Sequence, residues 1–470
     1  MLHCRAVEPT NDGDLPRRQD RLAETLTKYL ERGARANVSK LIGRVRPADV
    51  ALLLADLETD RQRQVFDILT ADYADAAGEV LTEMSPAQRL ALLEQLPPER
   101  TAAVLSRIPV DDAVFVLESL PAPLHDQVLE LVDLKDLAGV QTQLAFREGS
   151  AGRIMDPDLF ALPESETVQA AIGAIQQKRD LEMIFYLYVV DRDGHLVGVT
   201  SLRQLLLSKP AQTLGEIMQR SVIKVDVDTD QEEVAQLAAR YDLLAVPVVD
   251  RQNRLAGIVT VDDIIDVVKE EATDDLFKVA GTSEDELIYE ERTLKVAGLR
   301  LKSLLVSLAG LLVTGLLLEF FQVRFLEAMF LLAFVPVIMG LGGSIGGQAS
   351  AVTLRGLATG RFGGDEGGFL GVLWRQVKVG AVLGLGCGLL AGAAAIALKQ
   401  NPFYGLVVAA ALFCTVVLAS LIGATGPFFF DKVGLDPALA AGPAVATLND
   451  ITGILIYFGL ARVFLGHLLH

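Results

Sequence analysis

Five long apolar segments in the C-terminal part of the chain limit most strongly what it can fold into. They span roughly residues 303–322, 328–354, 369–398, 403–430 and 437–465. Each is long enough to cross about 30 Å of hydrocarbon as an α-helix. In lipid the backbone has to satisfy its own hydrogen bonds, which a helix does within a single segment. The sequence therefore predicts a membrane domain of five helical spans over residues 299–470.

The charged residues divide the chain and orient these spans. Residues 1–298 contain 32 Lys and Arg against 53 Asp and Glu, whereas residues 299–470 contain 10 against 7. The loop residues expected on the side of the N-terminal part are Lys295, Arg300, Lys302, Arg355, Arg361, Arg375, Lys378 and Lys432. By the positive-inside rule the N-terminal part is predicted to be cytoplasmic, and an odd number of spans leaves the C-terminus outside. The acidic N-terminal part argues against nucleic acid as a partner, and residues 1–21 lack the apolar core of a signal peptide.

One carboxylate lies near the middle of the fifth apolar segment. Gly442, Ala446, Asp450 and Gly453 recur at helical spacing, so a stripe of small residues carries a single charge. An acidic side chain at this depth costs about 3 kcal/mol unless it faces water, an ion or a partner. Asp450 is therefore either part of a cation pathway or a protonated group that is hydrogen-bonded between helices.

The second apolar segment is rich in glycine. Gly342/Gly346 and Gly343/Gly347 have the small-xxx-small spacing that lets helix backbones approach each other. Close helix packing is one interpretation of this pattern. The other is a local break in the helix that exposes carbonyl groups to a pathway.

A repeat of 12 residues occupies the chain from 85 to 132. Its four units read SPAQRLALLEQL, PPERTAAVLSRI, PVDDAVFVLESL and PAPLHDQVLELV, and ETDRQRQVFDIL at 58–69 fits the same template. Each unit opens with a proline or a polar start and continues with apolar residues at helical spacing. Helices this short cannot bury a core alone, so they are expected to stack as a helical superhelix. We expect an all-α N domain over residues 21–148, after a disordered N-terminus at 1–20.

Two similar α/β units follow. The segment IFYLYVVDRDGHLVGVTSLRQLL (184–206) reads as strand, turn, strand and helix, and LLAVPVVDRQNRLAGIVTVDDII (243–265) repeats it about 60 residues later. The pair resembles tandem cystathionine-β-synthase-type (CBS) domains, expected at 149–212 and 213–275. Such pairs bind adenine nucleotides in many proteins, and the resemblance implies that Gly257, Thr260 and Asp263 hold a nucleotide. The first unit has Gln204 where the acidic residue belongs, so a sensor without nucleotide is the alternative.

Acidic residues are concentrated in the second α/β unit. They are Asp226, Asp228, Asp230, Glu232 and Glu233 at its entry, and Asp262, Asp263, Asp266, Glu270, Glu271, Asp274 and Asp275 along its last helix. Such a cluster repels itself unless divalent cations bridge it. The ordinary explanation is a solvated acidic face. Its position ahead of a predicted connecting helix at 276–298 favours a role in coupling to the first span.

The order of these parts resembles the MgtE family of bacterial magnesium channels, over residues 20–465. The most specific motif is DPALAAGPAVATLNDITG at 436–453, which is similar to the fifth-span signature of that family. The second-span signature of the family is matched by Pro336, Gly342, Gly343, Gly346 and Gln348, with Ser344 in place of the usual Asn.

The resemblance implies roles for individual residues. Asp450 would be the metal-binding pore residue, with Gly442, Ala446, Gly342, Gly343 and Ser344 lining the pore. The cytosolic magnesium-sensing residues would be Asp230, Glu232, Asp242, Asp263, Asp266, Glu271, Asp274 and Asp275. The family also implies a homodimer in the inner membrane of a bacterium, with the pore between two copies of the fifth span.

These observations predict a gated, passive magnesium channel rather than an enzyme. Mg²⁺ is the expected ion, with Mn²⁺, Co²⁺ and Ni²⁺ as further candidates, and cytosolic Mg²⁺ is expected to close the pore. The alternatives are a CBS-regulated secondary transporter that exchanges a divalent cation for H⁺ or Na⁺, and a membrane-tethered sensor. No GxxxxGK[ST] motif that would indicate ATP-driven transport occurs in the sequence.

Overall fold

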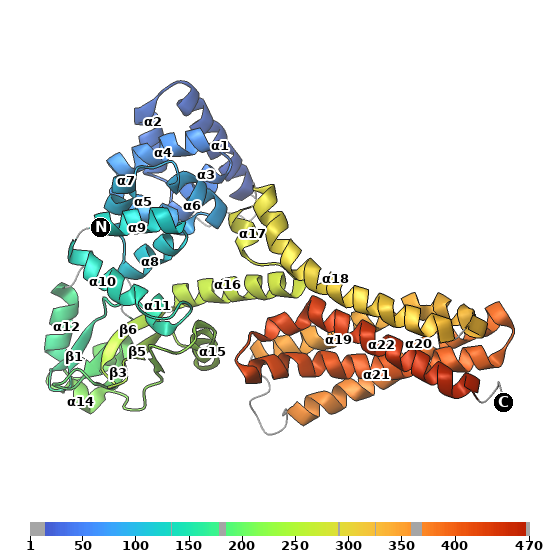
Figure 1. Ribbon diagram of the computed structural model, residues 1–470. Coiled ribbons are helices and arrows are strands. Elements are labelled where there is room, and N and C mark those ends of the chain that lie inside the picture. Colours follow the sequence, from blue (N-terminus) through green and yellow to red (C-terminus); the bar gives the residue numbers. More distant parts are fainter. Residues whose placement is uncertain are drawn as a thin grey trace. The chain divides into compact units, whose positions relative to one another are not determined.

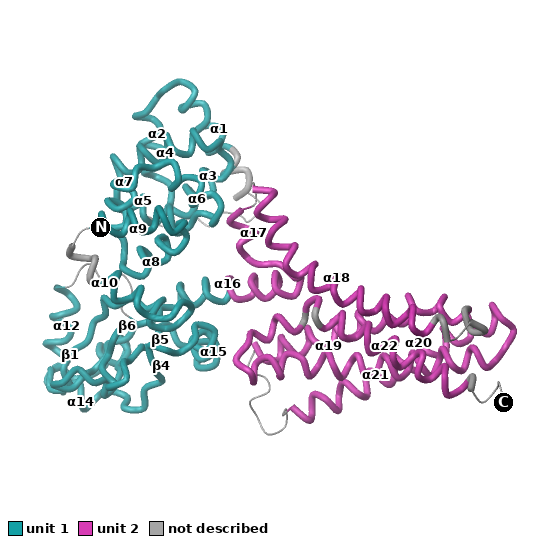
Figure 2. Tube along the Cα trace, in the orientation of Figure 1, with its two compact units in different colours: residues 1–268 teal, residues 269–470 magenta. Residues whose placement is uncertain are grey.

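The computed structural model describes residues 15–132, 134–177, 185–289, 292–324, 326–358 and 369–466 (Figure 1). The chain separates into two compact units, residues 1–268 and 269–470 (Figure 2). The first contains the helical repeat and the two α/β domains, and the second contains the membrane helices. The expected multi-domain architecture, with a helical N domain, a CBS pair and a helical membrane domain, is confirmed.

The N domain is a stack of short helices whose starts follow the sequence repeat. Its helices are α1 (Leu15–Glu31), α2 (Arg35–Ile42), α3 (Pro47–Ala55), α4 (Thr59–Asp72), α5 (Ala74–Glu83), α6 (Pro86–Leu93), α7 (Pro98–Leu105), α8 (Val110–Glu118), α9 (Ala122–Leu131) and α10 (Leu134–Leu144). From α6 to α9 the starts are 12 residues apart. Pro86 and Pro98 are first residues of their helices, where the missing N–H costs no hydrogen bond. The apolar positions of the units form one continuous core, including Leu54, Phe66 and Leu117.

Part of the N-terminus that we expected to be disordered is helical. Of residues 1–20, residues 1–14 lie outside the described part of the chain, and residues 15–20 belong to α1. The reason is downstream: Leu26 is 1 % exposed in the core of the N domain, with Leu22 packed against the same core. Burial of the apolar face that carries Leu22 and Leu26 stabilises α1, so the helix begins before residue 21.

Each CBS domain is built on a three-stranded sheet. The first contains α11 (Ala151–Ile154), β1 (Ala161–Pro163), α12 (Val168–Gln177), β2 (Tyr186–Val190), β3 (Leu196–Ser201) and α13 (Leu202–Leu207). The second contains α14 (Leu214–Ile217), β4 (Val225–Asp226), α15 (Gln231–Tyr241), β5 (Ala245–Val249), β6 (Leu255–Thr260) and α16 (Val261–Ala280). In both sheets the first strand pairs in parallel and the hairpin pairs antiparallel. The register of both hairpins shifts at equivalent places, at Val189/Val190 and Val248/Val249.

The connection to the membrane helices is not one helix over residues 276–298. Helix α16 ends at Ala280, α17 covers only Asp285–Ile288, and α18 begins at Thr293. The break follows from Gly281, whose φ of +80° is a conformation that residues with a side chain rarely adopt. Its N–H bonds to the Lys278 carbonyl and the next N–H bonds to that of Phe277, which closes the end of α16.

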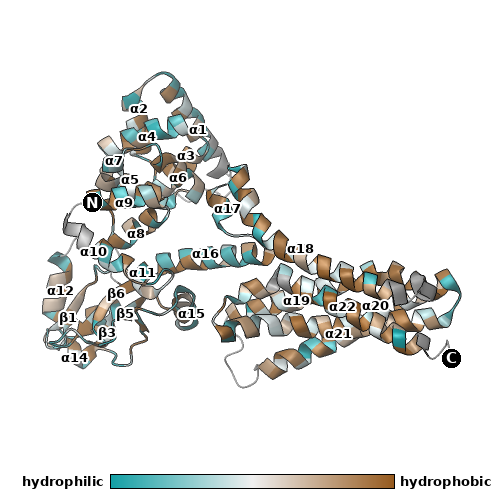
Figure 3. Cartoon of the chain, viewed as in Figure 1, coloured by the Kyte–Doolittle hydropathy of each residue, from teal (hydrophilic) through white to brown (hydrophobic). Residues whose placement is uncertain are grey.

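Five helical segments of the second unit are long and apolar enough to span a membrane, as predicted. They are carried by α18 (Thr293–Arg324), η1 (Leu326–Phe334) with α19 (Val335–Ala358), α20 (Phe369–Lys399), α21 (Pro402–Val433), and η2 (Pro437–Ala441) with α22 (Pro443–Gly466). Figure 3 shows apolar residues along the length of these helices. Helix α18 begins at Thr293, ten residues before the start of the expected apolar segment at 303.

The second and fifth spans differ in the continuity of their helices. The glycine-rich second span is a continuous α-helix over Val335–Ala358, so its glycines do not break the helix. Gly342 and Gly346 pack against α21 and α22, whereas nothing lies within 4 Å of a Cβ at Gly340, Gly343 or Gly347. The fifth segment, in contrast, is interrupted. The 3₁₀-helix η2 ends at Ala441, Gly442 is extended, and α22 starts at Pro443, which is favourable because a first-turn proline loses no hydrogen bond.

Helices α20 and α21 pack closely through a row of glycines. Gly380, Gly384, Gly388 and Gly392 are buried at four-residue spacing on α20. A Cβ at Gly388 would lie 2.7 Å from the Ala409 carbonyl oxygen, and one at Gly392 would lie 2.7 Å from that of Gly405. The two backbones are therefore in direct contact, as small-xxx-small packing predicts.

Candidate functional site

Asp450 lies in the middle of α22, the helix that packs against α18, α19 and α21. Its side chain is half-buried. Among the described residues its carboxylate has no hydrogen bond and no ion pair. The possibility that Asp450 is a hydrogen-bonded group between helices is therefore not supported by this structure.

The small residues expected to share a face with Asp450 have different surroundings. Ala446 is half-buried, like Asp450. Gly442 is buried, and a Cβ there would lie 3.1 Å from the Lys278 carbonyl oxygen. Gly453 faces the interior of the bundle, where a Cβ would lie 3.1 Å from Cγ2 of Thr415 and 3.4 Å from Cγ2 of Ile338. In this structure Ala446 and Asp450 share their degree of exposure, whereas Gly442 and Gly453 are packing positions.

The second-span residues also divide. Gly342 is buried, and a Cβ there would lie 3.3 Å from Cγ2 of Thr415. A Cβ at Gly343 would have nothing within 4 Å. Ser344 is exposed, and its hydroxyl lies 3.5 Å from Nε2 of Gln348 one turn further along α19. Gly343 and Ser344 are thus available to line a pathway, and Gly342 is a packing residue.

The end of α16 contacts the start of α22. A Cβ at Gly281 would lie 2.9 Å from Cγ of Pro443, and Val279 packs with Leu354 and Ala438. Lys278 bridges two carboxylates here, Asp274 on its own helix and Asp436 at the start of η2. These close contacts join the segment that follows the CBS pair to the helix that carries Asp450.

Charges around this contact are only partly balanced. Burial, and then the Asp436 carboxylate, raise the pKa of Asp275 to about 6. The Asp274 and Asp436 carboxylates raise the pKa of Lys278 above its ordinary value, against the opposing effect of burial. One ammonium group therefore serves several carboxylates, and a cation in this region would relieve the remaining repulsion.

A second group of carboxylates lies between the N domain and the second CBS domain, within the first unit. Burial raises the pKa of Asp111 to about 8 and that of Asp112 to about 7, and in both cases the next cause is Asp263. The pKa of Asp263 itself is raised to about 6, chiefly by burial. Asp156 contributes to all three shifts. Oδ1 of Asp111 is buried and has no hydrogen bond to any described residue.

Three members of this group, Asp111, Asp112 and Asp156, were not predicted from the sequence. Asp111 and Asp112 occupy the first turn of α8, where acidic residues are common because they stabilise the N-terminal end of a helix dipole. Asp156 lies after α11, outside the acidic runs. Nothing in the local sequence distinguishes them, because Asp111 and Asp112 approach Asp263, about 150 positions further along the chain, and Asp156 approaches Asp262.

The other predicted sensing residues do not gather at one place. Asp230 caps α15, accepts a hydrogen bond from the Glu232 N–H at 3.1 Å, and forms an ion pair with Arg147 at 2.9 Å. Asp242 is exposed at the opposite end of α15, with a φ of +52°. Asp266 is exposed and Glu271 half-buried on α16, and both have partners. The predicted cluster is therefore several separate groups along α15 and α16.

The predicted nucleotide loop has internal partners. Oγ1 of Thr260 donates a hydrogen bond to Asp263 at 2.6 Å, and the Thr260 N–H donates to the same carboxylate at 3.3 Å. A Cβ at Gly257 would lie 2.7 Å from Sδ of Met155 and 2.8 Å from the Asp156 carbonyl oxygen. Packing against the segment after α11 is enough to explain this glycine, without a ligand.

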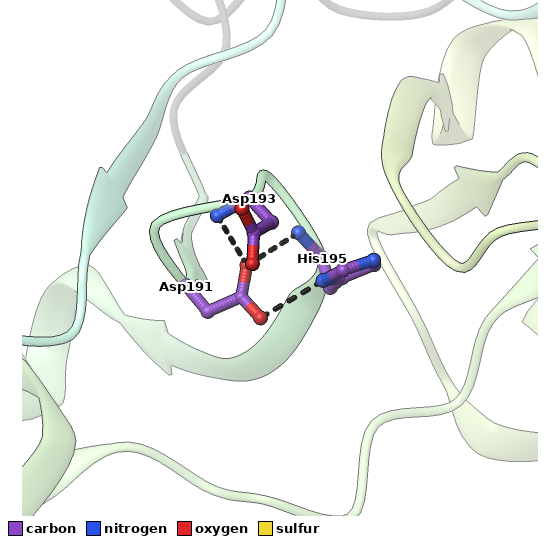
Figure 4. Close-up of side chains that lie close together, drawn as sticks. All are labelled: Asp191, Asp193 and His195. Atoms are coloured by element: carbon purple, nitrogen blue, oxygen red, sulfur yellow. Dashed lines mark hydrogen bonds and ion pairs between the residues drawn. The ribbon is translucent and has the colours of Figure 1, made fainter.

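A third group, Asp191, Asp193 and His195, lies at the hairpin turn of the first CBS domain (Figure 4). Their possible ligand atoms are within 4.8 Å of one another. Asp191 accepts hydrogen bonds from the Asp193 and His195 N–H groups and from Nδ1 of His195, which lowers the pKa of the Asp191 carboxyl. Asp250 accepts the same two backbone bonds in the second domain, where Arg254 takes the place of His195. These carboxylates therefore serve to stabilise the turns.

The fold and these sites define a multi-span membrane protein with a helical-repeat domain and a CBS pair. The family model described as divalent cation transporter matches residues 335–460, that of the MgtE intracellular N domain matches 45–149, and that of the CBS domain matches 151–209 and 214–270. The chain belongs to the MgtE family of magnesium transporters.

Relatives match over nearly the whole chain. The magnesium transporter MgtE of Thermus thermophilus is 37% identical over 454 residues, which are 95% of this chain and 99% of that protein. The magnesium transporter MgtE of Bacillus subtilis is 32% identical over 448 residues, or 95% and 98% of the two chains. A crystal structure described as the soluble part of a magnesium transporter is 29% identical, with a TM-score of 0.50, and covers 54% of this chain and 99% of that one.

Proposed function

We propose that this protein is a passive magnesium channel with Asp450 as the residue that binds the permeating ion. The observation that carries the proposal is a carboxylate in the middle of a membrane span that has no partner among the described residues. Such a group is costly in a bilayer unless a cation or water compensates it. Mg²⁺ gives up water reluctantly and keeps several waters, so a carboxylate can hold it through its hydration shell.

The membrane potential is sufficient to drive this movement. Two charges that cross a potential of about 100 mV gain about 4.6 kcal/mol. This requires the orientation that the loop charges predict, with the N-terminal part in the cytoplasm and the C-terminus outside, in the inner membrane of a bacterium. Mn²⁺, Co²⁺ and Ni²⁺ are candidate further ions, because their charge and preference for octahedral oxygen sites are similar.

The pathway is proposed to form between two copies of the chain. In one copy Asp450 is half-buried and half-exposed, and so is Ala446 one turn before it. A two-fold axis along this face would place two carboxylates opposite each other and enclose the pathway. Exposed Ser344 on α19 would then line the same pathway.

We propose that cytosolic Mg²⁺ closes the channel. The support is the set of carboxylates with raised pKa values outside the membrane spans: Asp111, Asp112 and Asp263 in the first unit, and Asp275 in the second. Burial is the largest cause of each raised value and repulsion from neighbouring carboxylates adds to it, so a divalent cation that bridges the ionised groups would stabilise the observed packing. The end of α16 contacts Gly442 and Pro443 at the start of α22, so a change in α16 can reach the helix that carries Asp450. Binding of an adenine nucleotide through Gly257, Thr260 and Asp263 stays a prediction.

The channel proposal is tested by Mg²⁺ uptake into liposomes that contain the purified protein. Asp450→Ala should abolish uptake, and Asp450→Asn should leave at most a small fraction, since the amide keeps a water-binding oxygen but loses the charge. Asp431→Ala, which removes a carboxylate near the end of α21, is the control and should transport normally. Uptake by Asp450→Ala at the wild-type rate would overturn the assignment. Dependence of uptake on an imposed H⁺ or Na⁺ gradient would favour the exchange transporter instead.

A further inference from the structure

Two buried polar side chains in the membrane domain have no hydrogen-bond partner among the described residues. They are Asn449 on α22, which is fully buried, and Thr415 on α21, which is 2 % exposed. Both amide atoms of Asn449 and the hydroxyl of Thr415 are unpaired. Buried polar groups in proteins are nearly always hydrogen-bonded, so each exception calls for a partner such as water or an ion.

Other buried hydroxyl groups on α19 and α21 are hydrogen-bonded. Ser420, which is 1 % exposed, donates to the Val416 carbonyl oxygen at 2.9 Å. Fully buried Thr353 donates to that of Ala349 at 3.0 Å, and fully buried Ser350 donates to that of Ala440 at 3.2 Å. The unpaired groups are therefore a local feature of Asn449 and Thr415.

The two side chains adjoin the glycines of α19. A Cβ at Gly346 would overlap with Nδ2 of Asn449, so this amide points at the glycine stripe. The place of a Cβ at Gly342 is bordered by Cγ2 of Thr415 at 3.3 Å and by the backbone oxygen of Asn449 at 3.9 Å. The unpaired Nδ2 of Asn449 therefore lies against Gly346, and the unpaired Oγ1 of Thr415 lies 3.9 Å from the Cβ position of Gly453, where α19, α21 and α22 pack together.

The chemistry of the pair selects a small, neutral ligand. The Asn449 amide offers donors and an acceptor, the Thr415 hydroxyl offers one of each, and neither carries a charge. Such a set suits water better than a bare ion, whose charge it would not balance. Asn449 also precedes Asp450, and consecutive side chains leave a helix about 100° apart, so the site adjoins the face that carries the carboxylate.

We propose that the unpaired groups of Asn449 and Thr415 hold ordered water that hydrogen-bonds to the hydration shell of the cation at Asp450. This rests on the proposed pathway and assigns it a further positioning residue, Asn449, on the protein side of the carboxylate. Since Mg²⁺ moves with much of its hydration shell, groups that orient these waters contribute to its affinity.

The first test asks whether the site is wet, in full-length protein in nanodiscs labelled by hydroxyl radicals generated from internal water. Ile338 is 1 % exposed. Its Cγ2 and that of Thr415 both lie close to the place that a Cβ at Gly453 would occupy. Ile338 should be oxidised in the wild type and protected in Asn449→Leu and in Thr415→Val, which remove the groups proposed to hold the water. Fully buried Val408 on α21 is the control and should be protected throughout. Protection of Ile338 in the wild type would overturn the proposal.

The second test separates a functional from a structural role. Asn449→Leu and Thr415→Val remove unpaired polar atoms at nearly constant volume, so the melting temperature should be unchanged or higher. The KM for Mg²⁺ uptake should nevertheless rise about tenfold, the effect typical of outer-shell groups at metal sites, and Asn449→Ser should restore part of it. Ser420→Ala is the matched control with a satisfied hydroxyl and should keep the wild-type KM. A wild-type KM in Asn449→Leu, or a KM that rises only as stability falls, would overturn the proposal, while the Asp450→Ala result would still decide the pathway itself.

Discussion

Two buried carboxylates of the N domain predict how the stability of this protein depends on pH. Asp111 and Asp112 begin α8, and their pKa values rise from 3.8 to about 8 and about 7 because burial and Asp263 disfavour their ionised forms. Between pH 3.8 and about 8 the folded protein therefore binds more protons than the unfolded chain. In that window the free energy of unfolding falls as the pH rises.

This gives a prediction for melting in the absence of divalent cations. The full-length protein in EDTA should have a lower melting temperature at pH 8 than at pH 6, and added Mg²⁺ should raise it more at pH 8, where the carboxylates are ionised. The double variant Asp111→Asn, Asp112→Asn should lose most of both effects. Asp126→Asn, at a carboxylate on α9 that is 77% exposed, is the control. Equal stabilisation of the double variant by Mg²⁺ would show that these residues do not bind it.

At the scale of elements, the membrane helices depend on glycine contacts whose positions can be tested in pairs. Gly388 and Gly386 lie two residues apart on α20, but only Gly388 touches the backbone of α21. Around Gly386 nothing lies within 4 Å of a Cβ. The two positions therefore have the same helix propensity and different packing.

Gly388→Val should destabilise the membrane domain by about 1–3 kcal/mol, because the added side chain forces α20 away from α21. Gly386→Val should have little effect, since its side chain points away from the described residues. Thermal unfolding of the purified protein, followed by size-exclusion chromatography, measures the difference. A similar loss of stability in both variants would mean that backbone conformation, and not packing between helices, makes these glycines necessary.

At the scale of the whole molecule, the proposed channel requires a second copy. A cysteine at Ala446, in a background without Cys4, Cys387 and Cys414, should crosslink two chains in the membrane. The reason is that Ala446 shares the half-exposed face of α22 with Asp450. A cysteine at Val382, which is 73 % exposed on α20, should remain monomeric under the same conditions. Failure to crosslink at any position along 442–453 would argue strongly against this interface.

The proposed closure by cytosolic Mg²⁺ is also tested on the whole chain. Replacing Asp263, Asp266, Asp274 and Asp275 together with Asn should give a channel that conducts at high cytosolic Mg²⁺ in a planar bilayer. In the wild type, millimolar Mg²⁺ should slow proteolysis of residues 276–298 more than Na⁺ at equal ionic strength, because bridged carboxylates hold the end of α16 in place. Normal closure of the fourfold variant would mean that these residues form only a solvated acidic surface.

Features that depend on neighbouring residues could be predicted from the amino-acid sequence. The five spans follow from length and hydropathy, the helix starts from α6 to α9 follow from a 12-residue repeat, and the two sheets follow from alternating strands that recur about 60 residues apart. Asp450 could be singled out because it is an acidic residue near the middle of a long apolar segment. All of these signals lie within one element, where helical or strand periodicity is sufficient to interpret them.

Contacts between residues that are distant in the chain could not be predicted in this way and come from the three-dimensional structure. Asp111 approaches Asp263, Lys278 reaches Asp436 across 158 positions, and Asn449 turns its amide into the bundle at Gly346. The sequence also predicted a single connecting helix, whereas Gly281 ends α16 and Pro443 starts α22 where the two helices touch. The physical reason is that burial and unbalanced charge arise from packing between elements, which local periodicity does not record.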